Sequence, residues 1–152
     1  MENILVKEEN FEKARKEIRE IKEKEGRVIF SSENDETNRK VLEKEKIQVL
    51  LLSQSKRKDF QKQRNSGFNQ VLAKIAKKEN IIIGIDLDEI IESFPKAKSE
   101  ILSRIKQNIK LCNKNKLNMV FISKKKENQR NFYDLKALGS VLKMPTWMLK
   151  EI

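Results

Sequence analysis

The sequence predicts an α/β protein built from parallel βα units, and three features of the chain support this fold class. Five short apolar runs rich in Ile and Val are candidate strands: "NILV" near Ile4, "RVIFS" near Val28, "IQVLLLS" from Ile47, "IIIGID" from Ile81 and "NMVFIS" from Met119. Their apolar residues are continuous, which is typical of strands covered on both faces in a parallel sheet. Helical patterns lie between the runs, as βαβ crossovers require.

The length of the chain limits how many such units it can hold. A complete (β/α)8 barrel usually needs about 200 to 250 residues, whereas this chain has 152. We therefore expect a single α/β domain, residues 1–152, with either a short open sheet or an incomplete barrel.

Capping residues and apolar periodicity place the first two helices. Asn10 is a suitable N-cap and Gly26 a suitable end for the helix after the first run. The predicted buried face of this helix is Phe11, Ala14, Ile18 and Ile21. The segment "ETNRKVLEKEK" after the second run predicts a short helix that buries Val41 and Leu42.

The same signals place the later helices. Ser66 is a natural N-cap for the helix after the third run, and its predicted buried face is Phe68, Val71, Leu72 and Ile75. A longer helix is expected from Pro95, with Ile101, Ile105, Ile109 and Cys112 in register. The last pair begins at "NFYDLKALGSVL", with Leu135, Leu138, Val141 and Leu142 buried, and ends in "PTWMLKEI", where Pro145 suits a first helical turn.

Charge is distributed unevenly along the chain. The formal net charge is +11, but residues 1–50 hold 12 basic and 13 acidic side chains while residues 51–152 hold 22 basic and 10 acidic ones. The commonest polyanion for such a basic surface is nucleic acid. An anionic membrane is less suitable because the apolar helix faces are moderate and are needed for the core.

The composition excludes several kinds of site. The chain contains no His and a single Cys, Cys112, which excludes Cys/His zinc sites, Ser-His-Asp triads and Cys-His pairs. No run approaches the length of a membrane span, and "MENILVKEEN" lacks the apolar stretch of a signal peptide. We therefore expect a cytoplasmic protein with no membrane partner.

Two basic loops are candidate binding surfaces, because ligands of parallel sheets bind where the carboxyl ends of the strands meet. The loop after the third run carries five cations and one acid, Asp59; the cations are Lys56, Arg57, Lys58, Lys62 and Arg64. Arg is a bidentate phosphate ligand, and the Ser66 and Gly67 amides at a helix start are possible phosphate donors. The loop after the fifth run carries Lys124, Lys125 and Arg130. The alternative for the first loop is a solvated connector in which Phe60 anchors the chain to the core.

Acidic residues at the same edge suggest a different chemistry. Asp86 lies at the end of the fourth run, and with Asp88 and Glu33 it would form the site of a metal-dependent phosphoesterase. Asp88 fits equally well as an N-cap, with Glu89 favouring the helix dipole. A divalent cation would need oxygen ligands gathered from scattered acids, so we favour capping and expect no metal site and no catalytic residue.

The segment "SKRKDFQKQRNSGFNQVLAKIAKKENIIIGIDLDEI", residues 55–90, resembles the hallmark region of the ribonuclease P protein component 3 family, the archaeal relative of the thirty-kilodalton eukaryotic subunit. The matching residues are Arg57, Lys58, Asp59, Ser66, Gly67, Asn69, Val71, Leu72, Ala73 and Asp86. Downstream, "NFYDLKALGSVLKMP" resembles the family's Asn-Pro-Tyr-Asp-Leu-Arg helix start, with Phe132 in place of the proline. Upstream, Asn38 and Arg39 stand where the family has Asn-Arg.

Three departures accompany this resemblance. Residues 60–65 separate Asp59 from Ser66, where the family motif is usually uninterrupted, and Gln70 stands in place of a His. The family's first strands are absent, because "NILVKEENFEKA" aligns best with its third βα unit. The resemblance therefore implies an incomplete or shortened TIM-barrel-like (PHP-like) fold.

The resemblance also implies a function. It is that of an RNA-binding subunit of ribonuclease P, which removes the 5′ leader from precursor tRNA with RNA as the catalyst and Mg²⁺ as the ion of that RNA. The implied partners are ribonuclease P RNA, precursor tRNA and protein component 2, in a heterotetramer. The expected RNA-binding residues are Asn38, Arg39, Lys56, Arg57, Lys58, Lys62, Arg64, Ser66, Gly67, Asn69, Lys124, Lys125 and Arg130. The alternatives are the phosphoesterase and a generic basic RNA-binding module.

Overall fold

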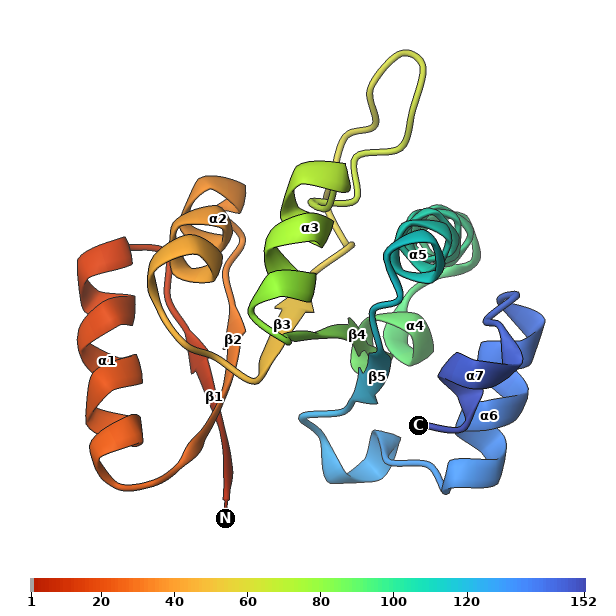
Figure 1. The fold of residues 1–152 in the computed structure, drawn as a ribbon. Coiled ribbons are helices and arrows are strands. Elements are labelled where there is room, and N and C mark those ends of the chain that lie inside the picture. Colours follow the sequence, from red (N-terminus) through yellow and green to blue (C-terminus); the bar gives the residue numbers. More distant parts are fainter. Residues whose placement is uncertain (1) are drawn as a thin grey trace.

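The computed structural model describes residues 2–152, and its strands form one five-stranded sheet (Figure 1). The strands are β1 (Asn3–Lys7), β2 (Arg27–Ser31), β3 (Val49–Leu52), β4 (Ile82–Asp86) and β5 (Met119–Ile122). They lie in sequence order, and every neighbouring pair is parallel. The α/β class and all five predicted strands are confirmed.

Helices connect the strands and complete the chain. They are α1 (Phe11–Glu23), α2 (Asp35–Lys44), α3 (Gln70–Lys78), α4 (Leu87–Glu92), α5 (Pro95–Asn115), the 3₁₀ turn η1 (Lys126–Asn128), α6 (Phe132–Val141) and α7 (Thr146–Leu149). Over residues 2–152, no helix has both the length and the apolar character that a membrane crossing requires.

The winding of the chain is that of a barrel that does not close. Strand order equals sequence order, whereas a doubly wound sheet reverses direction partway along the chain. Figure 1 shows α1, α2, α3 and α5 side by side along the sheet. Within residues 2–152, β1 and β5 are the two edges of the sheet and do not pair with each other, which agrees with an incomplete TIM-barrel-like fold.

The sheet has apolar side chains on both faces, as its continuous apolar runs predict. Val28 and Phe30 belong to the main core, which includes the buried faces of the helices. Ile29, between them in β2, belongs to a smaller cluster with Val49 and Leu51 on the opposite face. Successive strand residues point to opposite faces, so the alternation divides each run between two apolar layers.

Two predicted core positions and two predicted caps are wrong. The N-cap of α3 is Asn69 and not Ser66, so the buried face of α3 shifts to Leu72, Ala73 and Ala76 and Val71 is 55% exposed. Similarly, Val141 is 69% exposed at the end of α6. Asp86, and not Asp88, caps α4. Tertiary contacts engage both residues predicted as caps: Asp88 accepts hydrogen bonds from Ser123, the Lys124 amide and Asn128, and the Ser66 carbonyl accepts one from Gln54.

Candidate nucleic-acid interface

The longest connection at the carboxyl edge of the sheet is the loop between β3 and α3, which we call the hallmark loop (residues 53–69). Figure 1 shows it as the yellow-green segment that projects beyond α3. Five of the predicted RNA-binding cations belong to it. Its base is tied to the sheet and helices, while its tip, residues 60–63, is exposed.

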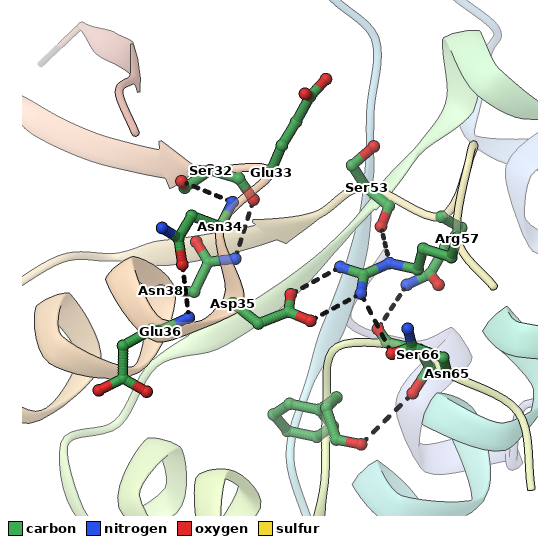
Figure 2. Close-up of polar contacts among 12 residues, drawn as sticks. Ser32, Glu33, Asn34, Asp35, Glu36, Asn38, Ser53, Arg57, Asn65 and Ser66 are labelled. Atoms are coloured by element: carbon green, nitrogen blue, oxygen red, sulfur yellow. Dashed lines mark hydrogen bonds and ion pairs between the residues drawn. The ribbon is translucent and has the colours of Figure 1, made fainter. Parts of the chain in front are cut away.

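Arg57 fixes the base of the hallmark loop. Its Nη1 and Nη2 each donate to an Asp35 carboxylate oxygen at 2.9 Å, and its Nε donates to the Ser53 carbonyl at 2.6 Å. Figure 2 shows this guanidinium between Asp35 and Asn65. Because the bidentate pair joins the hallmark loop to the first turn of α2, Arg57 has a structural role and its side chain is largely covered.

The conformation and surroundings of Gly67 require a glycine at this position of the hallmark motif. Its φ is +72°, and a Cβ at this position would lie 2.9 Å from Arg57 Cζ and 2.9 Å from Asp35 Oδ1. Only glycine combines this backbone conformation with so close an approach. Arg57 and Gly67 therefore meet in space, although the six residues 60–65 interrupt the motif between them.

Asp59 closes the other side of the loop. Two residues of α5 that the sequence analysis missed, Arg104 and Gln107, hold the loop there. Arg104 Nε and the Asn65 amide each donate to Asp59 Oδ1 at 2.9 Å, and Arg64 donates to Oδ2 at 2.9 Å. The hydrogen bond from Arg104 is the main reason why the pKa of Asp59 is lowered to about 2. Gln107 Nε2 donates to the Arg64 carbonyl at 2.9 Å.

Arg104 is buried, and all three of its side-chain nitrogens donate to the loop. Besides Asp59, it donates to the carbonyls of Gln54 and Arg57, each at 2.9 Å. One sequence signal could have identified it, since Arg104 lies on the same face of α5 as Ile101 and Ile105. A charged side chain on an apolar helix face needs a buried partner.

Besides Arg57 and Gly67, three more of the predicted RNA-binding residues belong to the scaffold. Asn38 is fully buried and donates to the Ser32 carbonyl at 3.0 Å. Ser66 is also buried, and its carbonyl accepts from Gln54 Nε2 at 2.9 Å. Asn69 accepts from the Leu72 amide as the cap of α3. In this conformation the side chains of Asn38 and Ser66 are not available to a ligand.

An open cleft lies beside the hallmark loop, and Arg64 is the loop cation that lines it. This cleft has a volume of about 680 Å³ and lies between the loop tip, α2, α3 and α5; its lining includes Arg39, Phe60, Arg64, Gly67 and Gln107. Phe60 is 58% exposed, so the interpretation in which it anchors the loop to the core is wrong. Lys56, Lys58 and Lys62 are exposed and form no salt bridge with any residue of 2–152.

The second basic loop, residues 123–131, is neutralised more fully. Lys124 Nζ lies 2.9 Å from Asp86 Oδ2, and Lys125 pairs with Glu92. Arg130 is exposed and donates to the carbonyls of Glu127 and Gln129. Of the three predicted contacts in this loop, two are therefore already paired with carboxylates.

The acidic residues at this edge bind protein groups. Burial raises the pKa of Asp86, against the opposing effect of Lys124. Burial would also raise the pKa of Asp88, but hydrogen bonds from Asn128, the Lys124 amide and Ser123 outweigh it and lower that pKa. Glu89 accepts hydrogen bonds from Ser53, Ser55 and the Gln54 amide.

This arrangement disfavours the phosphoesterase alternative. A lysine ammonium stands next to Asp86, where a divalent cation would have to bind. Asp86 and the exposed Glu33 line a second cleft, of about 580 Å³. Within residues 2–152, no three Asp, Glu, His or Cys side chains are close enough to hold a metal ion.

Comparison with known proteins finds similarity in sequence and in structure. The chain is similar to the ribonuclease P protein component 3 of Methanothermobacter thermautotrophicus, with 24% identity over 130 residues. That alignment covers 86% of this chain and 49% of the relative, so the chain spans about half the length of the curated relative it matches. No family model matches the chain.

The structural match agrees with the sequence match. The fold is similar to a chain in the cryo-EM structure of archaeal ribonuclease P with mature tRNA, with a TM-score of 0.77 and 19% identity. The superposition covers 96% of this chain and 62% of the other, and at this identity it shows a shared fold. The chain is therefore similar in sequence to a ribonuclease P protein component 3, the family that its motifs resemble, and it shares its fold with a chain of archaeal ribonuclease P.

Proposed function

We propose that the chain is an RNA-binding protein subunit of ribonuclease P that supports RNA-catalysed removal of the 5′ leader from precursor tRNA. The observation that carries this proposal is the construction of the hallmark loop. Its motif residues Arg57, Asp59 and Gly67 face inward and hold the loop, while Lys56, Lys58 and Lys62 face solvent. Exposed lysines that are free of carboxylate partners are suited to phosphate contacts.

The proposed partners follow from the family and from the charge of the surface. They are ribonuclease P RNA, precursor tRNA within the complex, and protein component 2 in a heterotetramer, in the cytoplasm. In this proposal the RNA catalyses the cleavage with Mg²⁺, and the protein contributes no catalytic residue.

Reconstitution tests the proposal directly. The purified chain is added, with component 2, to the cognate ribonuclease P RNA, and cleavage of precursor tRNA is measured at low Mg²⁺. We expect stimulation by the wild-type chain and a reduced effect for Lys56→Gln, Lys58→Gln, Lys62→Gln. The matched control is Lys13→Gln, Lys16→Gln, Lys22→Gln, which removes the same charge from the exposed face of α1.

The outcomes separate the competing functions. Absence of stimulation with a correctly folded chain would refute the subunit role and leave the generic RNA-binding module. Hydrolysis of a simple phosphate ester with added Mn²⁺, abolished by Asp86→Ala, would instead support the phosphoesterase.

A further inference from the structure

The helical layer of the protein has a charge gradient that the hallmark loop does not explain. Helix α1 carries five basic and four acidic side chains, and α2 carries three of each. By contrast, α3 carries three basic and no acidic side chains, and α5 carries six basic and one acidic. The uncompensated positive charge of this layer therefore lies on α3 and α5.

Six exposed lysines on these two helices form what we call the α3–α5 lysine surface. They are Lys74, Lys77 and Lys78 of α3 and Lys106, Lys110 and Lys114 of α5. None of the six forms a salt bridge with any residue in the part of the chain that the structure describes. They differ in this respect from Arg57, Arg64, Lys124 and Lys125, which are all paired with carboxylates.

Direct contacts hold the two helices together, so their lysines belong to one surface. Lys77 Nζ donates to the Lys116 carbonyl, just beyond the end of α5, at 2.9 Å. Gln70 and Asn115 exchange side-chain hydrogen bonds of 2.9 and 3.0 Å. Figure 1 shows α3 and α5 as neighbours, with the hallmark loop projecting beyond them.

The geometry of the surface suits a regular array of negative charges. Lys106, Lys110 and Lys114 follow one another at intervals of four residues, which on a helix rising about 1.5 Å per residue gives steps of about 6 Å along one ridge. Lys74 and Lys78 repeat the interval on α3. A row of point charges of this kind contacts phosphates and carries no sequence information.

The chemistry of the two helices distinguishes among polyanions. Neither α3 nor α5 contains a Phe, Tyr or Trp, so the two helices themselves offer no aromatic ring on which an unpaired base could stack. Trp147 of α7 is partly buried, and its Nε1 donates to Asn113 Oδ1 of α5 at 3.1 Å. Their large apolar side chains face the core, except Val71 at the start of α3, so little apolar surface is available to enter a membrane. Phosphates presented without accessible bases are a property of double-helical RNA.

We propose that the α3–α5 lysine surface binds the phosphate backbone of double-helical RNA, next to the contacts made by the hallmark loop. This inference rests on the proposed RNA-binding function and extends it to a second surface and to a class of RNA structure. The two surfaces are adjacent, because Gln107 of α5 bonds to Arg64 of the hallmark loop. A duplex on α3 and α5 would therefore lie beside the loop tip.

The test compares three triple variants that remove the same charge. Two lie in the surface: Lys74→Gln, Lys77→Gln, Lys78→Gln and Lys106→Gln, Lys110→Gln, Lys114→Gln. The control is Lys13→Gln, Lys16→Gln, Lys22→Gln on α1, where acidic neighbours already balance the charge. The probe is a mixed-sequence RNA duplex unrelated to ribonuclease P, and its dissociation constant is measured over a range of KCl concentrations.

The expected result is a change in the salt dependence of binding. Each phosphate contact contributes roughly 0.7 to 0.9 to the slope of log K against log salt, so each surface triple should lower that slope by about two. Affinity at the lowest salt should fall about tenfold or more, while the control retains the wild-type slope. A double variant, Lys74→Gln, Lys78→Gln, keeps the Lys77 contact to Lys116. It should show an intermediate change in the salt slope and should unfold at the wild-type temperature.

Several results would overturn the inference. One is that the surface triples bind the duplex with the wild-type slope of log K against log salt. Another is that the triples bind the duplex normally and lose only binding to single-stranded oligouridine or to phosphatidylserine vesicles. The proposed function fails separately: a chain that does not stimulate ribonuclease P, but whose surface triples lose duplex binding, refutes the subunit role and retains this surface.

Discussion

Arg57 and Asp35 form a bidentate pair that joins the hallmark loop to the first turn of α2, with both Nη to Oδ distances at 2.9 Å. The two residues are 22 positions apart in the sequence. Arg57 is largely covered, while Asp35 is about half exposed. The conformation of the loop is thus fixed by a contact between two βα units, and the exposed lysines keep their positions because of it.

Replacement of Arg57 should destabilise the protein and loosen the loop. Arg57→Lys keeps the charge but loses the planar group that reaches both Asp35 oxygens and the Ser53 carbonyl. We expect a decrease of about 1 to 2 kcal/mol in the free energy of unfolding, since the solvent around Asp35 weakens the ion pair. Urea denaturation measures this decrease, and a double-mutant cycle with Asp35→Asn gives the coupling free energy between Arg57 and Asp35.

The matched control is Lys58→Ala, whose exposed side chain should matter little to stability. A change of less than about 0.5 kcal/mol is expected there. Equal losses for Arg57→Lys and Lys58→Ala would contradict the structural role of Arg57.

Gly67→Ala should be among the most damaging substitutions in the loop. A left-handed backbone costs a non-glycine residue about 1 to 2 kcal/mol, and the new Cβ would meet Arg57 Cζ and Asp35 Oδ1 at 2.9 Å. The steric part should be relieved when Arg57 is also Ala, because that change removes one contact and frees Asp35 from the pair that holds it, whereas the backbone part should remain. Urea denaturation separates the two parts when Gly67→Ala is made both in the wild type and in Arg57→Ala. If the losses in free energy of unfolding from the two substitutions simply add, the steric contact has no effect.

The sequence predicts the strands and most of the buried helix faces because these depend on local patterns of apolar residues. It does not distinguish Ser66 from Asn69 as the cap of α3, since both residue types are good caps. The choice depends on Gln54, which holds the Ser66 carbonyl, and on the left-handed Gly67, which a helix cannot contain.

The ion pairs of the candidate site could not be predicted from local patterns. Arg104 and Asp59 are 45 positions apart, and Lys124 and Asp86 are 38 apart. Sequence analysis identifies all of these as charged residues but does not show which cations are neutralised. The distinction between paired and unpaired cations, which decides where RNA can bind, therefore appears only in the folded protein.

Asp59 should titrate well below an ordinary aspartate. Its folded-state pKa is about 2, against an ordinary value of 3.8, because Arg104 donates to the carboxylate. A lowered pKa means that its contribution to stability is fully present above about pH 4 and is lost as the pH falls through about 2. NMR of the Asp59 carboxyl carbon and of the Asn65 amide, which donates to Asp59, should report the same midpoint.

Arg104→Lys provides the comparison for this titration. It keeps a positive charge but cannot reproduce the fork that contacts Asp59, Gln54 and Arg57. The Asp59 midpoint should move up toward 3.8. A wild-type midpoint that is already near 3.8 would show that the loop is not closed in solution.

The tip of the hallmark loop should be dispensable for folding but not for RNA binding. The Asn65 amide donates to Asp59 at 2.9 Å and Gln107 holds the backbone of Arg64, so the loop is closed below residues 60–63. Replacing Phe60–Gln63 with two glycines keeps these contacts. We expect the free energy of unfolding to change by less than about 0.5 kcal/mol, measured in urea.

RNA binding identifies which residue of the tip matters. Lys62 is the cation lost in the glycine replacement, so the salt slope should fall by roughly 0.7 to 0.9, as it should for Lys62→Gln alone. Phe60→Ala keeps that charge and removes the exposed ring. If it weakens binding to single-stranded RNA while the slope stays unchanged, Phe60 stacks on a base, because stacking contributes affinity without releasing counterions. If Phe60→Ala binds like the wild type, the tip acts through Lys62 alone.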